Sequence, residues 1–302
     1  MYSKVYKRNK RYKVIRLKKI ILIVVFFLVA ITGIKFYDKK VLMSSFYNNA
    51  NVKNNEEVKT DKEETSNDVK YIDTDIESQL QQLCKKDSRV KTILKNINEY
   101  PTDILNLLIK NPETIDFVLG YPSKKDIRED AVITSKQYVN GVPNFKQWDQ
   151  RWGYENYGDK ILALSGCGPT SLSMVVIALT GNTSATPSTI AKYSESKGYY
   201  VNGKGTSWEL ITKGCQNYGL TSKEVPLSEK SMVKELEENK LIICSMAPGD
   251  FTSEGHFIVI RDYENGKFVV NDPNSIKLSS KSWSYEELQG QINNLWSFSA
   301  SK

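Results

Sequence analysis

A run of fifteen uncharged residues, 20–34, places the strongest constraint on this chain. The run is apolar on all sides, so it does not suit a surface helix of a globular domain, which has one apolar face and one polar face. Fifteen residues fall short of the roughly 20 that cross a bilayer, but flanking lysines and aromatic residues can extend the span. Residues 20–37 are therefore predicted to form a transmembrane signal anchor, with a cleaved signal peptide as the alternative.

The positive charge of the chain is concentrated before and around this run. Residues 1–40 hold 12 Lys/Arg and one acidic residue, whereas the net charge of the whole chain is +7, so the remainder is mildly acidic. A nucleic-acid partner is not expected, because a binding surface would carry the basic residues on a folded domain. The basic arm, residues 1–19, is predicted to stay in the cytoplasm. The rest is predicted to lie outside the cell membrane, or to be secreted if the segment is cleaved.

Three regions follow, and they differ in composition. Residues 38–75 are mostly polar and are predicted to form a flexible stalk. Residues 76–123 show apolar residues at helical spacing and are predicted to form a small helical module, which could be a propeptide, a spacer or a packing partner. Residues 138–302 contain all five tryptophans and are predicted to be the main domain.

The main domain has a mixed pattern of helices and strands. Helices are expected after Cys167, and antiparallel strands are expected nearer the C-terminus, which indicates the α+β class. The expected helices cover 188–197, 207–218 and 228–239, and the expected strands cover 241–246, 256–263 and 267–271.

Cys167 stands out among the four cysteines. It lies in Ser165-Gly-Cys-Gly-Pro169, directly before an apolar stretch that reads as a buried helix, and proline suits the first turn of a helix. A helix N-terminus favours the thiolate, which is the reactive form of cysteine. Cys84, Cys215 and Cys244 lie among apolar residues and are predicted to fill the core. A structural role for Cys167 is the alternative to a nucleophilic one.

A nucleophilic thiol needs a base, and His256 is the only histidine of the chain. It begins an apolar strand, where its ring can point out of the end of the sheet. Asp272, which ends the next strand, is preferred over Asn271 and Asp262 as the acceptor that orients His256. A strand-ending turn is the alternative role for Asp272.

The hairpin between these strands decides whether Asp272 can reach His256. A two-residue Asn265-Gly266 turn would place Asp272 opposite Val259, on the wrong face of the sheet. A three-residue loop from Glu264 to Gly266 would pair Tyr263 with Lys267 and bring Asp272 to the face of His256. The three-residue loop is therefore predicted, unless a separate bulge shifts the pairing.

Four motifs together resemble a known enzyme group. They are Val142-Pro-Asn-Phe-Lys-Gln-Trp-Asp149, Gly166-Cys-Gly-Pro-Thr-Ser171, Gly255-His-Phe257 and Asn271-Asp-Pro273. In this order they are similar to the bacteriocin-leader-peptidase-like branch of the papain-like cysteine peptidases.

This resemblance implies a papain-like fold in which helices pack on an antiparallel sheet. It also implies that Cys167 is the nucleophile, His256 the base, Asp272 the orienting residue and Gln147 the oxyanion donor, with Gln150 as the fallback. No phosphate-binding Gly-Lys-Ser/Thr loop is present and the domain is expected outside the membrane, so trimming of bacteriocin leaders is not expected. No motif indicates a metal or another cofactor.

The sequence thus predicts a membrane-anchored extracytoplasmic cysteine peptidase, which hydrolyses peptide or amide bonds of a peptide, protein or cell-wall peptide substrate through a Cys-His-Asp triad. One alternative is a peptidoglycan amidase or endopeptidase. The other is a non-catalytic binding module with Trp148, Trp152 and Trp208 as its contact surface; these tryptophans are interpreted instead as core or cleft wall.

Overall fold

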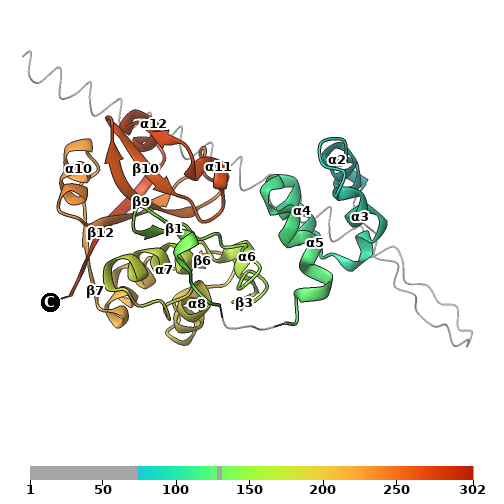
Figure 1. Ribbon diagram of the computed structural model, residues 1–302, viewed down its shortest axis with the longest axis horizontal. Coiled ribbons are helices and arrows are strands. Elements are labelled where there is room, and N and C mark those ends of the chain that lie inside the picture. Colours follow the sequence, from blue (N-terminus) through green and yellow to red (C-terminus); the bar gives the residue numbers. More distant parts are fainter. Residues whose placement is uncertain (1–73, 128–130, 302) are drawn as a thin grey trace, which may run out of the picture. The chain divides into compact units, whose positions relative to one another are not determined.

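The computed structural model describes residues 74–127 and 131–301 (Figure 1). The predicted basic arm, the predicted signal anchor and nearly all of the predicted stalk lie outside these residues. Within the described ranges, no helix has the length and apolar character needed to cross a membrane.

Helices make up the first described segment. They are α2 (Thr74–Cys84), α3 (Val90–Lys95), α4 (Thr102–Lys110) and α5 (Ile115–Lys124), with the short 3-10 turns η1 (Ile97–Glu99) and η2 (Pro112–Thr114) between them. The side chain of Asn111 accepts a hydrogen bond from the Glu113 amide, which caps η2. Apolar residues such as Leu80, Ile93 and Leu108 are fully buried and hold the helices together.

A six-stranded sheet forms the centre of the following segment. Its order is β11-β10-β9-β8-β12-β7, and each strand is antiparallel to its neighbours. The strands are β7 (Leu220–Glu224), β8 (Leu241–Met246), β9 (His256–Glu264), β10 (Lys267–Asn271), β11 (Ser282–Trp283) and β12 (Ile292–Ala300). With helices against this sheet, the α+β class is confirmed.

The sequence analysis missed β7 and β12. In β7 only the first residue, Leu220, is buried, because this edge strand faces solvent with the rest of its length. In β12 the pairing with β8 shifts between Ile292 and Asn294, which breaks the alternation of apolar and polar residues. Neither strand therefore shows the two-residue period by which a half-buried strand is recognised.

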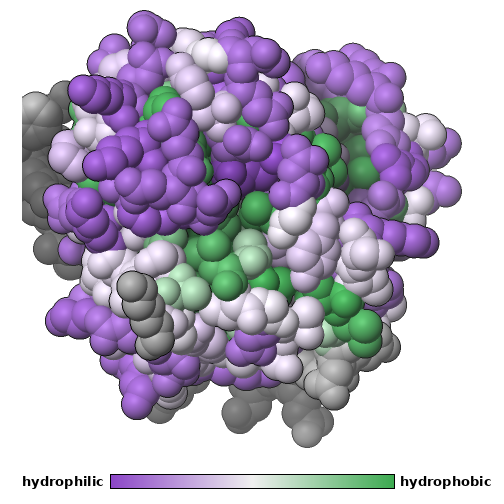
Figure 2. All heavy atoms as spheres, turned by 60° about the vertical axis from the view of Figure 1, so that its left-hand side comes forward, coloured by the Kyte–Doolittle hydropathy of each residue, from purple (hydrophilic) through white to green (hydrophobic). Residues whose placement is uncertain are grey.

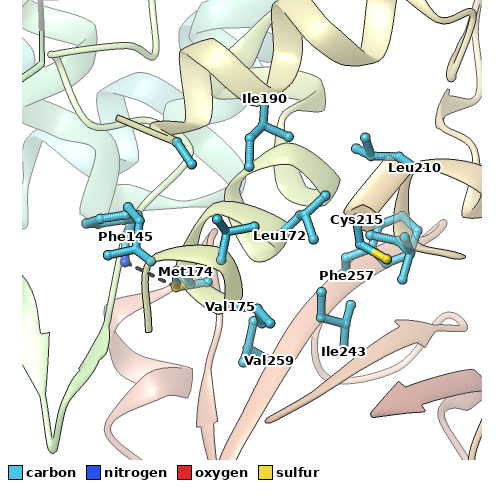
Figure 3. Close-up of a cluster of buried hydrophobic side chains, with 14 of the residues drawn as sticks. Phe145, Leu172, Met174, Val175, Ile190, Leu210, Cys215, Ile243, Phe257 and Val259 are labelled. Atoms are coloured by element: carbon cyan, nitrogen blue, oxygen red, sulfur yellow. Dashed lines mark hydrogen bonds between the residues drawn. The ribbon is translucent and has the colours of Figure 1, made fainter. Parts of the chain in front are cut away.

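The apolar helix α7 (Cys167–Thr180) packs against one face of the sheet, where Leu172 and Val175 belong to the same buried cluster as Ile243 of β8 and Val259 of β9 (Figure 3). The helix ends at Gly181, whose φ of 71° suits glycine. Burial on nearly all sides explains why its sequence is rich in apolar residues and has no charged ones.

Further helices cover both faces of the sheet (Figure 1). The side of α7 also holds α6 (Leu162–Ser165), α8 (Pro187–Ser196), α9 (Trp208–Thr212) and the 3-10 turn η4 (Gly214–Tyr218). The other side holds α10 (Glu229–Glu237), α11 (Ile276–Ser279) and α12 (Tyr285–Gln289). The expected helices over 188–197 and 228–239 correspond to α8 and α10, whereas 207–218 divides into α9 and η4.

Short hairpins complete this segment. They are β1 (Tyr138–Val139) with β2 (Val142–Pro143), β3 (Asn156–Tyr157) with β4 (Lys160–Ile161), and β5 (Tyr200–Val201) with β6 (Gly205–Thr206); η3 (Ser135–Gln137) precedes them. Figure 2 shows one face of the molecule, where a band of hydrophobic residues crosses a largely hydrophilic surface.

The predicted three-residue loop between β9 and β10 is wrong. Lys267 pairs with Glu264, and Asn265 and Gly266 form a two-residue turn with φ of 52° and 74°. A bulge at Arg261 then shifts the register, so that Val270 pairs with Ile260. Because of this bulge, Asp272 lies on the same face of the sheet as His256, which is the placement that the three-residue loop was expected to give.

Candidate active site

Cys167 is the first residue of α7 and follows Gly166 at the N-cap. Its side chain is half-buried, and it lines two cavities of about 380 and 690 Å³. The N-terminal end of a helix carries partial positive charge, which stabilises an anion such as a thiolate. The thiol is thus accessible and lies in the setting that the sequence predicts.

The two glycines beside Cys167 allow close packing. A Cβ atom on Gly166 would lie 2.5 Å from the backbone oxygen of Leu162, and one on Gly168 would lie 2.6 Å from the Thr206 side chain. Both separations are shorter than a carbon can tolerate. The glycines therefore seat the start of α7 against α6 and β6, in addition to leaving room around the thiol.

Gly166→Ala is expected to lower the free energy of unfolding by about 1–3 kcal/mol, because the new methyl group meets backbone that cannot move aside cheaply. Urea unfolding monitored by tryptophan fluorescence measures the change. Gly290→Ala is the matched control, since a Cβ atom there has nothing within 4 Å and its φ is −74°. Equal unfolding midpoints for the two variants would show that the start of α7 is loosely packed.

His256 is the first residue of β9, and Asp272 directly follows the end of β10. The Nε2 atom of His256 lies 2.7 Å from Oδ1 of Asp272, and both side chains are buried. Since Nε2 is engaged by Asp272, Nδ1 is the ring nitrogen left for Cys167, which lines the same two cavities as His256. The structure therefore brings the three predicted residues together in the order thiol, imidazole, carboxylate.

Opposing effects act on the pKa of His256. Burial alone would lower it, but the charge and hydrogen bond of Asp272, together with Cys167, raise the pKa to about 10. The imidazole is consequently held in its protonated form at neutral pH. A positive charge beside the Cys167 sulfur favours a thiolate–imidazolium pair.

Asp272 is held from several directions. Its Oδ1 also accepts a hydrogen bond of 2.7 Å from the Asn274 amide, and its own amide donates to Ser279 Oγ. The buried ammonium of Lys146 donates to the backbone oxygen of Asp272 and to Ser279. Burial lowers the pKa of Lys146 to about 8, although the charges of Asp272 and Glu113 oppose this shift.

The sequence analysis did not identify Lys146, Asn274 or Ser279 as part of the site. Lys146 lies beside Gln147 in the recognised motif, but nothing in the sequence indicates that its side chain is buried under Asp272. A lysine is almost never buried without partners, and besides Asn144 the partners here are more than 120 positions away.

Gln147 lines the larger cavity together with Cys167 and His256. Its Nε2 donates one hydrogen bond of 2.8 Å to the Ala163 backbone oxygen, which fixes the amide and leaves its second N–H for another acceptor. Gln150, the fallback, does not line this cavity; its Nε2 donates to the Asp116 backbone oxygen. Of the two glutamines, the structure brings Gln147 to the site.

The tryptophans proposed as a joint contact surface have separate environments. Trp152 is 1% exposed and donates to the Lys146 backbone oxygen, and Trp148 donates to the backbone oxygen of Asn274. Trp208 is exposed and lines the smaller cavity. Trp152 therefore belongs to the core, Trp148 contacts the turn after Asp272, and Trp208 forms part of the cleft wall.

Two of the other cysteines are less exposed than Cys167. Cys215 and Cys244 are buried, and burial raises the pKa of each thiol. Cys84 ends α2, is half-buried and packs against the core of the helical segment. All four cysteines are free thiols.

The model of the Peptidase_C39 like family matches residues 139–300, which is more than half of the chain. No curated protein matches the chain.

Three solved structures are similar to part of the chain. The peptidase domain of Streptococcus ComA, a bifunctional ABC transporter involved in quorum sensing, is 18% identical with a TM-score of 0.36, covering 46% of this chain and 93% of that one. A putative C39-like peptidase from Bacillus anthracis is 15% identical with a TM-score of 0.39, covering 53% and 96%. A double-glycine-motif protease from an AMS/PCAT transporter, in complex with a leader peptide, is 20% identical with a TM-score of 0.30, covering 45% and 84%.

Proposed function

Because this chain belongs to the Peptidase_C39 like family, we propose that it is a cysteine peptidase in which Cys167, His256 and Asp272 form the catalytic triad. The observation that carries the proposal is the position of the imidazole, which is hydrogen-bonded to a buried carboxylate and lines the same two cavities as an accessible thiol. A nucleophile, a base and an orienting group gathered at one cleft are what acyl transfer through a thiol requires.

In the proposed reaction, the Cys167 thiolate attacks the carbonyl carbon of the scissile bond. The free N–H of Gln147 and the backbone N–H of Cys167 donate to the oxyanion that forms. The His256 imidazolium gives its proton to the leaving amine, which departs as the acyl-enzyme forms. Neutral His256 then takes a proton from water, whose hydroxide attacks the thioester and releases the acid and the thiol.

The two cavities support cleavage within a chain. Cys167 and His256 line both of them, and so do Lys160, Leu164 and Glu254, so the space continues on either side of the thiol. A polypeptide can therefore extend in both directions from the scissile bond, as an endopeptidase requires. Peptide bridges of the cell wall fit the same space and form the second substrate class to be tested.

Activity is tested with the full-length protein, incubated with a mixture of peptides and, separately, with purified cell wall. Mass spectrometry of new amino termini is expected to reveal cleavage by the wild type and none by Cys167→Ser. Cleavage of cell wall alone would assign the protein to the amidase or endopeptidase class acting on peptidoglycan. Absence of cleavage, combined with no selectively reactive cysteine, would indicate a non-catalytic binding module.

We also propose that the peptidase domain acts outside the membrane, attached by residues 20–37. The support is the basic arm before a charge-free apolar run, since positive residues are retained on the cytoplasmic side. Protease added to intact cells is expected to remove the domain, and a protected domain would contradict this topology. A mature chain that begins near Gly33 would replace the anchor with a signal peptide.

A further inference from the structure

The larger cavity beside Cys167 is shared between two parts of the chain. One part is the site itself, with Gln147, Cys167 and His256, and the other is helix α4, which contributes Asp103, Asn106, Leu107 and Lys110. The loop 249–255 lines the cavity as well. The space beside the thiol thus has α4 as one of its walls.

The segment after α4 is hydrogen-bonded to the turn that holds Asp272. Asn111 Nδ2 donates to the Asn274 backbone oxygen at 2.6 Å, and the Asn274 amide donates to Asp272 Oδ1 at 2.7 Å. That same oxygen meets His256. A continuous series of short contacts therefore leads from Asn111 to the imidazole.

Glu113 forms a second link to the same turn. Its two carboxylate oxygens accept hydrogen bonds of 2.8 Å from the backbone amides of Ile276 and Lys277, at the start of α11. Hydrogen bonds from backbone amides to a carboxylate are stronger than neutral ones. Glu113 thereby fixes the residues that directly follow the Asp272–Asn274 turn.

Apolar packing joins the helices to the peptidase domain more widely. The Phe117 and Tyr154 rings stack with centroids 4.3 Å apart, and the Tyr154 hydroxyl donates to the Phe117 backbone oxygen. Ala163, which neighbours the site, is fully buried in the same cluster as the residues of α4 and α5. The helical segment and the peptidase domain share one core here, as expected of a permanent contact.

On these contacts, and resting on the proposed function, we propose that α4 and η2 are a working part of the peptidase. Lys110 and Asn106 contact the bound polypeptide on one side of the scissile bond, and Asn111 and Glu113 are positioning residues for Asp272. The alternative is a propeptide that restrains the enzyme. The two assignments differ in sign, since weakening an inhibitory contact raises activity and weakening a positioning contact lowers it.

Asn111→Asp tests the positioning role in the full-length protein. Aspartate keeps the oxygen that caps Glu113 but replaces the donor to the Asn274 oxygen with a second acceptor. We expect kcat to fall by about 10- to 100-fold with little change in KM, because a small displacement of a catalytic group has an effect of this size. The pH dependence of Cys167 alkylation is also expected to change, which a purely structural residue would not cause.

Asn96→Asp is the matched control, because Asn96 is an exposed residue of the same helical segment whose side chain donates only to the Thr92 backbone oxygen. Glu113→Gln is expected to act in the same direction as Asn111→Asp. Unchanged kcat in both variants, or increased kcat in either, would overturn the positioning role.

Lys110→Glu tests the cleft wall. The ratio of kcat/KM for peptides with acidic and with basic residues flanking the scissile bond is expected to shift by about fivefold, the scale of one exposed charge pair. The rate of Cys167 alkylation by iodoacetamide should stay the same, because this small reagent does not reach α4. Lys95→Glu, at the end of α3, is the charge-matched control, and an equal shift in both variants would contradict the assignment.

Experiments on the wild-type protein distinguish failure of the proposed function from failure of the role assigned to α4 and η2. If Cys167 shows no selective alkylation and no peptide is cleaved, the proposed function fails. If Cys167 is selectively reactive and peptides are cleaved, but the α4 and η2 variants match their controls, only this inference fails.

Discussion

Replacement of Asp272 by alanine is expected to lower kcat by about 10⁴-fold, the scale seen when the orienting carboxylate of a triad is lost. The free energy of unfolding is expected to fall by about 3–5 kcal/mol, because the buried ion pair is broken and the imidazole loses its hydrogen-bond partner. Steady-state kinetics and urea unfolding measure the two effects. A variant within tenfold of wild-type activity would remove Asp272 from the proposed triad.

The pH dependence of this loss of stability has a defined sign. Against the lowering effect of burial, Asp272 and Cys167 raise the pKa of His256 from about 6.5 to about 10, so the stabilisation is complete below pH 6.5 and disappears as pH rises through 10. The difference in unfolding free energy between wild type and Asp272→Ala is therefore expected to be larger at pH 6 than at pH 10. A difference that grows with pH would contradict the ion pair.

Asp272→Asn tests the charge of Asp272 separately from its hydrogen bond to His256. Because the Asn274 amide donates to the Oδ1 position, the amide oxygen of the new side chain is expected to occupy that position and still accept from His256. Its NH₂ group then takes the place of Oδ2, which is buried and without a hydrogen-bond partner. We expect this variant to retain at least about tenfold more activity than Asp272→Ala. The alkaline limb of its pH–activity profile is expected to move to lower pH.

Selective alkylation of Cys167 is the second large effect expected. Iodoacetamide should modify Cys167 at least about 100-fold faster than Cys215 or Cys244, since those thiols are buried and their pKa values are raised. The reaction of Cys167 should persist below neutral pH, where protonated His256 stabilises the thiolate. Mass spectrometry of tryptic peptides after timed labelling gives each rate.

His256→Ala supplies the control for this experiment. Without the imidazolium beside the sulfur, labelling of Cys167 is expected to slow, most clearly below neutral pH. Cys84 is half-buried and serves as an internal reference in the same digest. Equal rates for Cys167 and Cys215 in the wild type would count against a catalytic thiol.

Local sequence features were sufficient to predict the central strands and to single out candidates for a nucleophile and its base. Gly166 and Pro169 mark the start of a helix at Cys167, and the largely apolar, uncharged residues after it favour burial. A single histidine at the start of an apolar strand left one candidate for the base. These signals act over a few residues, so they are visible without knowledge of the fold.

Tertiary structure decided the features that depend on pairing between distant segments. Asp272 lies on the face of His256 because of a bulge at Arg261, and the turn sequence at Asn265-Gly266 does not indicate this bulge. The ammonium of Lys146 is buried under Asp272, and Asn111 contacts Asn274 from 163 residues away. Such contacts form only when the chain is folded, because each depends on backbone placed by the packing of other elements. Local sequence therefore indicates which groups are candidates for the reaction. Only the folded chain shows how the Asp272 carboxylate and the helices around it are held.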